Sequence, residues 1–322
     1  MRCVKCGNDV KKKDRVAAGG RCPNCKHQFV TIPEMDGITD MVLANAEKVV
    51  SGNGTYHFLA KQLEYQLYRT FLKKQRSSGS TVSFTLVFVV VSLILSVAAT
   101  PVFLVLTLIG VITVIVTLVK SSSYDTTLVR LHTVVQKWTD TNPHPKLIKN
   151  KKYEFNSDNS HLEEVSFDRV LVCDSNDTVN FFLENLFHFH YSCPVLGGNG
   201  YPEAICGDML RRLKSNTNLK VFLLHDYSPQ GSAFVRKMRT DPNWFGDRQY
   251  QIVDLGLNFD QKDKLFKFMT RGNNETAEVT LFTPATLIML CGAAINEEVA
   301  LDQVHLVADQ SGGGDGGSGG YG

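Results

Sequence analysis

The sequence predicts an α/β domain with a parallel sheet, joined to a membrane-spanning helical hairpin and to a small cysteine-rich unit at the N-terminus. Three observations predict this fold. Strand and helix patterns alternate in the C-terminal half, two pairs of cysteines lie near the N-terminus, and no Asp, Glu, Lys, Arg or His occurs in the 39 residues from Thr81 to Val119. Each observation favours one part of the fold.

The two cysteine pairs predict a metal site. Cys3 and Cys6 form one CxxC turn, and Cys22 and Cys25 form a second, 15 residues further on. Zinc binds four thiolates at tetrahedral corners, and each CxxC turn presents two of them. We expect the intervening segment to form a short hairpin that brings the turns together. The sequence therefore predicts a structural zinc ribbon in residues 1–30, with these four cysteines as ligands.

The ribbon is also basic. Residues 1–30 carry eight Lys or Arg and two Asp. Such a charge attracts nucleic acid or anionic lipid headgroups. The alternative, a solvated basic face without a ligand, stays open.

Residues 31–80 are predicted to form a helical linker. Apolar positions recur at helical spacing in Ile38–Val50, Ser51–Gly54 breaks the pattern, and Tyr56–Lys74 forms a second, aromatic-rich helix.

The uncharged stretch 81–119 predicts two transmembrane helices. Val82–Ala99 and Val102–Val119 are 18 residues each, about 27 Å as helices, close to the thickness of the hydrocarbon core. Pro101 separates them, since proline disfavours helix continuation. The alternative is a buried hairpin in the core of a soluble protein.

The flanks of this stretch predict its orientation. Lys73, Lys74 and Arg76 precede it, and Lys120 and Arg130 follow it, so the positive-inside rule places both flanks on the cytoplasmic side. The sequence thus predicts an integral membrane protein with both termini cytoplasmic and membrane lipid as a partner. Small residues within the spans permit close helix contact, so a homo-oligomer, and a structural subunit of a membrane assembly, remain alternatives.

Residues 120–152 are expected to form a helix and a linker, and the α/β pattern follows. Expected strands lie at 169–173, 193–196, 220–224 and 251–255, and expected helices at 178–189, 203–214, 231–239 and 260–269. This alternation is typical of a parallel sheet with helices on its faces, where function collects at the carboxyl ends of the strands.

The residues at those strand ends carry a resemblance. Asp174 follows the first strand, Gly198-Asn199-Gly200-Tyr201-Pro202 follows the second, and His225-Asp226-Tyr227-Ser228-Pro229-Gln230-Gly231 follows the third. This order resembles the Toprim domain of the type IIB topoisomerase A subunit and of the related meiotic double-strand-break proteins. The resemblance covers Asp168 to Met269 and implies a Toprim-like domain over residues 153–309.

The resemblance implies a nucleic-acid-related site with departures from the family pattern. Family members hold Mg²⁺ in an acidic cluster that steers phosphodiester chemistry. Asp174 stands in place of the family's glutamate, Asp226 matches its first aspartate, and Ser228 replaces its second. The domain that carries the family's catalytic tyrosine has no counterpart.

These departures imply a degenerate, non-catalytic Toprim-like domain that binds a nucleic acid or protein partner. Its candidate ligand-binding residues are Gly198, Gly200, Tyr201 and Ser228. The alternative is a Mg²⁺-dependent phosphoryl-transfer enzyme or nuclease that uses Asp174 and Asp226 as catalytic residues.

The C-terminal region is expected to contribute one more helix. Thr280–Ile295 is apolar but shorter than a membrane span, so we expect a buried helix of the α/β core. Residues 310–322 are a Gly-rich tail, for which composition predicts disorder.

Overall fold

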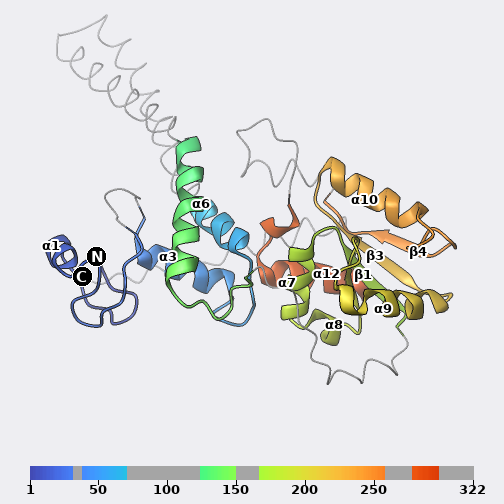
Figure 1. Cartoon of the computed structure of the whole chain (residues 1–322), viewed down its shortest axis with the longest axis horizontal. Coiled ribbons are helices and arrows are strands. Elements are labelled where there is room, and N and C mark those ends of the chain that lie inside the picture. The colour runs from blue at the N-terminus through green and yellow to red at the C-terminus, as the bar shows by residue number, and fades with distance from the viewer. Residues whose placement is uncertain (32–37, 71–123, 150–166, 258–277, 297–322) are drawn as a thin grey trace, which may run out of the picture. The chain divides into compact units, whose positions relative to one another are not determined.

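The computed structural model describes residues 1–31, 38–70, 124–149, 167–257 and 278–296 (Figure 1). The chain divides into two compact units. The first joins Met1–Ala46 with Leu63–Pro143, and the second joins Glu47–Gln62 with His144–Gly322.

The described part of the first unit is mostly helical apart from the cysteine-rich turns. It contains α1 (Lys12–Ala17), most of α3 (Asp40–Val50) and α6 (Tyr124–Thr141). Residues 60–70 are also helical. Apolar side chains on the three longer helices are buried, and they are Leu43, Leu63, Leu67, Leu131, Val134 and Trp138.

The buried carboxylate of Asp40 fixes the chain that leaves the cysteine-rich turns. Its oxygens accept hydrogen bonds from the amides of Val30 and Thr31 at 3.1 and 2.9 Å, and from the Thr31 hydroxyl at 2.6 Å. A fully buried carboxylate needs such donors because burial without them is costly.

The second unit contains a four-stranded parallel sheet in the order β2-β1-β3-β4. The strands are β1 (Arg169–Cys173), β2 (Val195–Gly197), β3 (Lys220–Leu224) and β4 (Gln251–Asp254). β1 and β3 are buried along four of their five residues, as expected for the interior strands of a sheet covered on both faces.

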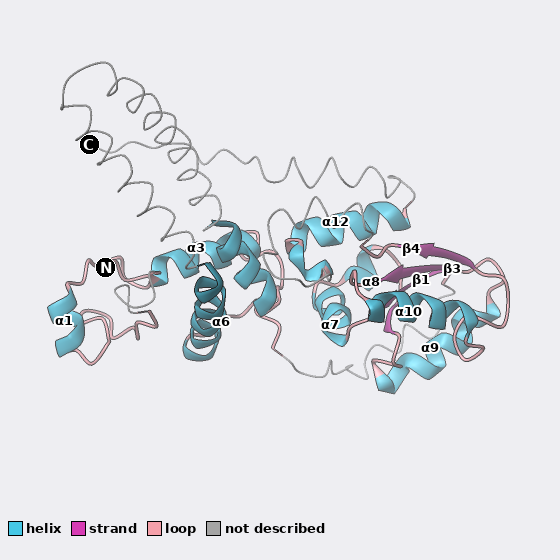
Figure 2. Ribbon diagram, turned by 90° about the horizontal axis from the view of Figure 1, so that it is seen from above, coloured by secondary structure: helices cyan, strands magenta, loops and turns pink. Residues whose placement is uncertain are grey.

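Helices cover both faces of this sheet. They are α7 (Asn176–Glu184), α8 (Phe187–His190), α9 (Glu203–Ser215), α10 (Pro229–Thr240) and α12 (Pro284–Ile295), the last preceded by the 3₁₀ turn η2 (Val279–Leu281). Figure 2 shows α12 on one side of β1, β3 and β4, with α9 and α10 on the other. Alternate residues of β1 and β3 form one core cluster with Met209 of α9 and Met238 of α10.

The predicted α/β class and its parallel sheet are confirmed, with local differences. The expected helix 178–189 is divided between α7 and α8, because Leu186 takes a left-handed conformation with φ of 55°. The expected buried helix over Thr280–Ile295 is present as η2 and α12. The expected helix 260–269 and the tail 310–322 lie outside the described residues.

The prediction of a transmembrane hairpin is corrected. Across the described ranges, no helix combines the length and apolar character that a membrane crossing requires. The segment 81–119 itself lies outside the described residues. The prediction rests on the length of an uncharged run, which favours a membrane span, and no described helix supports it. The integral-membrane location, the cytoplasmic placement of both termini, the lipid partner and the membrane assembly all depend on that hairpin, and they are unsupported.

The close approach of Gly256 to the end of β3 gives a first prediction. A Cβ at Gly256 would lie 2.0–2.3 Å from three atoms of the buried His225 ring. We expect Gly256→Ala to lower the free energy of unfolding by about 1–3 kcal/mol, because the ring has to shift within a packed site. Urea denaturation measures the change.

Gly207→Ala is the matched control. Gly207 lies within α9, and a Cβ there would meet nothing within 4 Å. Alanine should therefore raise stability by about 0.5–1 kcal/mol through helix propensity. Equal effects of the two substitutions would contradict the packing described around His225.

Candidate metal centre and acidic cluster

Each cysteine pair closes a tight turn of the same design. The amide of Gly7 donates to the carbonyl of Cys3, and the amide of Lys26 donates to that of Cys22, both at 2.9 Å. Gly7 and Lys26 hold positive φ angles of 74° and 60°. The segment between the turns contains helix α1 in place of the expected hairpin.

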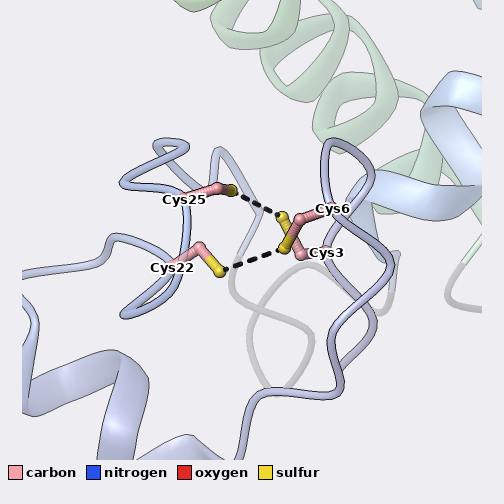
Figure 3. Close-up of side chains that lie close together, drawn as sticks. All are labelled: Cys3, Cys6, Cys22 and Cys25. Atoms are coloured by element: carbon pink, nitrogen blue, oxygen red, sulfur yellow. Dashed lines mark hydrogen bonds between the residues drawn. The ribbon is translucent and has the colours of Figure 1, made fainter.

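The two turns bring the four sulfur atoms together (Figure 3). The Sγ atoms of Cys3 and Cys25 are 3.6 Å apart, and those of Cys6 and Cys22 are 3.7 Å apart. All four lie within 4.8 Å of one another. Tetrahedral zinc with Zn–S bonds of about 2.3 Å requires sulfur separations of about 3.8 Å. The four cysteines can therefore hold one metal ion, and their geometry is compatible with zinc.

The thiols of this cluster differ in electrostatic environment. Burial raises the pKa of Cys3 to about 12. The backbone amide of Asn8 lowers the pKa of the exposed Cys6 to about 6. A bound cation would favour the thiolate form at every position, since metal binding requires deprotonated sulfur.

The surface around the cluster is positively charged. Of the eight basic residues in this region, Arg15 is buried and the other seven are exposed. The exposed residues are Arg2, Lys5, Lys11, Lys12, Lys13, Arg21 and Lys26.

Two aspartates meet at the carboxyl ends of the central strands β1 and β3. The amide of Asp226 donates to Oδ2 of Asp174 at 2.9 Å. Oδ1 of Asp226 accepts from the amide of Val279 at 2.7 Å. The structure therefore brings the two predicted residues together, and backbone amides occupy one oxygen of each.

Both carboxyl groups have pKa values above their usual range. Burial raises the pKa of Asp226 to about 6, with the charge of Asp174 adding to the effect. Burial also raises the pKa of Asp174, against a lowering by the Asp226 amide. Oδ1 of Asp174 is buried and has no hydrogen-bond partner among the described residues.

Ser228, the third predicted member of this site, has a structural role. Its hydroxyl accepts a hydrogen bond from the amide of Gly231 at 2.9 Å and caps the N-terminus of α10. This is the ordinary function of serine at the first turn of a helix.

The glycine-containing turn after β2 is held by protein contacts. The hydroxyl of Tyr201 donates to Oδ1 of buried Asn180 at 2.6 Å. The carbonyl of Gly198 accepts from the ammonium of Lys237 at 2.9 Å. Gly200 has a φ of 93° and free space around its Cβ position. Tyr201 thus fixes the turn from inside, whereas Gly200 lies at its open edge.

His225 places a positive charge beside the aspartates. Its Nδ1 lies 2.7 Å from the carbonyl oxygen of Asp226, and its Nε2 lies 3.0 Å from Oδ1 of Asp254. Both partners are acceptors, so both ring nitrogens must carry a proton. Burial lowers the pKa of His225, but the bonds to Asp254 and to the Asp226 carbonyl outweigh it and raise the pKa above its usual value.

Sequence reasoning missed three charged residues of this region. Asp254 ends β4, and the rule that function collects at strand ends could have found it. The ammonium of Lys61 lies 3.0 Å from both carboxylate oxygens of Glu278, across 217 residues of sequence. No local sequence pattern predicts the contact between Lys61 and Glu278.

Among the described residues, the acidic side chains do not form a group of three that could share one ion. Within the described ranges, the four cysteines are the group of three or more Cys, His, Asp or Glu side chains whose ligand atoms lie close enough to share an ion. Mg²⁺ requires several oxygen ligands at about 2.1 Å in octahedral geometry. Asp174 and Asp226 each use one carboxylate oxygen for a backbone amide, and the Ser228 hydroxyl caps a helix.

The fold and the sites define a protein with a parallel α/β unit and a cluster of four cysteines that can hold one metal ion. Over 66 residues, the chain is 36% identical to the meiotic recombination protein SPO11-4 of Oryza sativa subsp. japonica. The matched region is 20% of this chain and 14% of the relative, so the chain spans a small part of that protein. No family model matches the chain, and no solved structure matches it.

Removal of one cysteine ligand tests the metal centre. We expect the purified protein to carry about one zinc ion, and Cys22→Ser to lose it, because three thiolates no longer close the tetrahedral site. Elemental analysis measures the zinc content. Cys206→Ser, at a buried cysteine of α9 outside the cluster, should retain the metal. Equal zinc in both variants would contradict the assignment.

The charge of His225 can be observed directly. We expect nitrogen-15 NMR at pH 7 to show both ring nitrogens of His225 protonated, since both donate to oxygen. His188 is the internal comparison: burial lowers its pKa and its Nδ1 has no hydrogen-bond partner among the described residues, so its ring should be neutral. A neutral His225 at pH 7 would contradict this account of the strand ends.

Proposed function

We propose that this chain is a nucleic-acid-binding protein whose residues 153–309 form a degenerate, non-cleaving Toprim-like domain. One observation carries the proposal. Asp174, the turn at Gly198–Pro202 and Asp226 follow adjacent strands of one parallel sheet, in the order typical of that domain. The partial similarity to a meiotic recombination protein supports the same direction.

The acidic residues are the reason why we propose a domain that does not cleave nucleic-acid strands. Ser228 provides a helix cap where the family pattern has an aspartate, and one carboxylate fewer weakens binding of a divalent ion. The Asp174 carboxylate then joins the ends of β1 and β3 by accepting from the Asp226 amide, and the Asp226 carboxylate holds the amide of Val279. Gly198 and Gly200 are the proposed contact positions in this domain, with Tyr201 holding their turn.

The cysteine-rich region is the proposed electrostatic contact. Cys3, Cys6, Cys22 and Cys25 would hold zinc and keep residues 1–30 rigid, with seven basic side chains exposed around them. Lys and Arg bind the phosphate backbone without reading sequence. In this division of the chain, residues 31–80 and 120–152 connect the two binding regions, and residues 310–322 form a tail.

Nucleic-acid binding by the full chain tests the proposal. We expect fluorescence anisotropy to show binding to a labelled DNA duplex that weakens steeply between 50 and 200 mM salt, because phosphate contacts release counterions. Lys11→Ala with Lys13→Ala should weaken binding several-fold and reduce the salt dependence. Lys137→Ala with Lys149→Ala removes the same charge from exposed positions elsewhere and should leave the affinity nearly unchanged.

The outcomes separate the candidate functions. Equal losses in the two double variants would remove the cysteine-rich region from the contact, and no binding at low salt would contradict the proposal. Plasmid nicking that requires Mg²⁺ and is abolished by Asp226→Asn would instead support the nuclease alternative.

A further inference from the structure

Asp174, Asp226 and Glu278 are called the acidic cluster below. Lys61 reaches this cluster from a part of the chain that is remote in sequence. It lies in the helical residues 60–70, and Glu47–Gln62 belongs to the second compact unit with the sheet. Its ammonium is 3.0 Å from both carboxylate oxygens of Glu278. A symmetric contact of this kind places the positive charge between the two oxygens.

The neighbouring Gln62 fixes the position of this segment. Its Oε1 accepts from the amide of Leu59 at 2.9 Å, and its Nε2 donates to the carbonyl of Phe282 at 3.0 Å. Gln62 is 3% exposed, so losing either bond would leave a buried polar atom unpaired. The two hydrogen bonds of buried Gln62 therefore hold Lys61 beside residues 278–282.

Glu278 in turn belongs to the acidic cluster. The residue after it, Val279, donates its amide to Oδ1 of Asp226 at 2.7 Å. The Thr280 hydroxyl donates to Oε2 of Glu278 at 3.0 Å. The charge of Glu278 raises the pKa of both Asp226 and Asp174, whereas Lys61 lowers the pKa of Asp226. Three carboxyl groups thus repel one another, and Lys61 opposes that repulsion.

We propose that Lys61 is the resident positive charge of this cluster, acting on Asp226 as well as on Glu278, and that the segment 47–62 thereby completes the α/β unit. The ammonium offsets the repulsion among the carboxylates, as a bound cation would. Lys61 is a positioning residue in this account. The proposal goes beyond nucleic-acid binding and does not depend on it.

The competing explanation is an ordinary surface ion pair. The side chain of Lys61 is 57% exposed and that of Glu278 is 35% exposed, and pairs of this kind contribute little on average. An isolated pair would couple Lys61 to Glu278 alone. A charge that balances the cluster must also couple Lys61 to Asp226, with which it makes no direct bond among the described contacts.

A double-mutant cycle on the full-length, zinc-loaded protein distinguishes the two. We expect Lys61→Met to lower the melting temperature by about 2–4 °C. In an Asp226→Asn background the same substitution should have at most half that effect, because the carboxylate it opposes is gone. Lys61→Arg keeps the charge and should stay within about 1 °C of the wild type.

Two controls make the result decisive. Lys48→Met removes an exposed lysine from the same unit and should show the same small effect with and without Asp226→Asn. Addition of 1 mM Mn²⁺ should leave the wild-type melting temperature unchanged.

An equal effect of Lys61→Met in both backgrounds would reduce Lys61 to a partner of Glu278 and overturn the proposal. Stabilisation of the wild type by Mn²⁺ that disappears in Asp226→Asn would also overturn it. If Lys61→Met alone does not fold, recovery of folding in the double variant supports the proposal, and failure to recover contradicts it. None of these results changes with the outcome of the DNA-binding test.

Discussion

The hydrogen bond from the Asp226 amide to the Asp174 carboxylate is the constraint around which the second unit is arranged. Parallel pairing of β1 and β3, with Cys173 opposite Leu224, brings the residues after both strands to one edge. The bond at 2.9 Å then closes that edge. A part-buried carboxylate placed there is costly unless donors and positive charges surround it. The positively charged side chains near this edge lower that cost.

Positive charge reaches this edge from two directions. His225 precedes Asp226 in sequence and is held between it and Asp254 at the end of β4. Lys61 comes from a segment outside the strand-and-helix alternation and pairs with Glu278. Glycines at 231 and 256 leave room for the histidine ring, since a Cβ at either position would fall within 2.6 Å of one of its atoms. Packing and electrostatics therefore select the same side chains.

The sequence predicted the strands and turns that are determined by residues close together in the chain. The bounds of β1 and β3 were predicted as observed, since each is a short apolar run between turn residues. The cysteine spacing predicted the four-sulfur cluster, because each turn is closed by its own backbone. Leu186 shows the limit of this reasoning: its left-handed conformation ends α7, and a leucine gives no sign of such a break. The hairpin prediction rested on uncharged composition alone, and no described helix has the length and apolar character to support it.

Contacts between remote segments account for the rest. Asp174 and Asp226 could be placed together because the topology of alternating strands and helices places them. Lys61 and Glu278 could not, since 217 residues separate them and each stands in a sequence without a distinguishing motif. The two kinds of residue nevertheless act on the same site. The motif residues Asp174 and Asp226 place negative charge at the strand ends, and Lys61, which lies outside the motif, offsets it. A family motif therefore identifies where charge is concentrated, whereas the side chains that make the concentration tolerable are found only once the chain is folded.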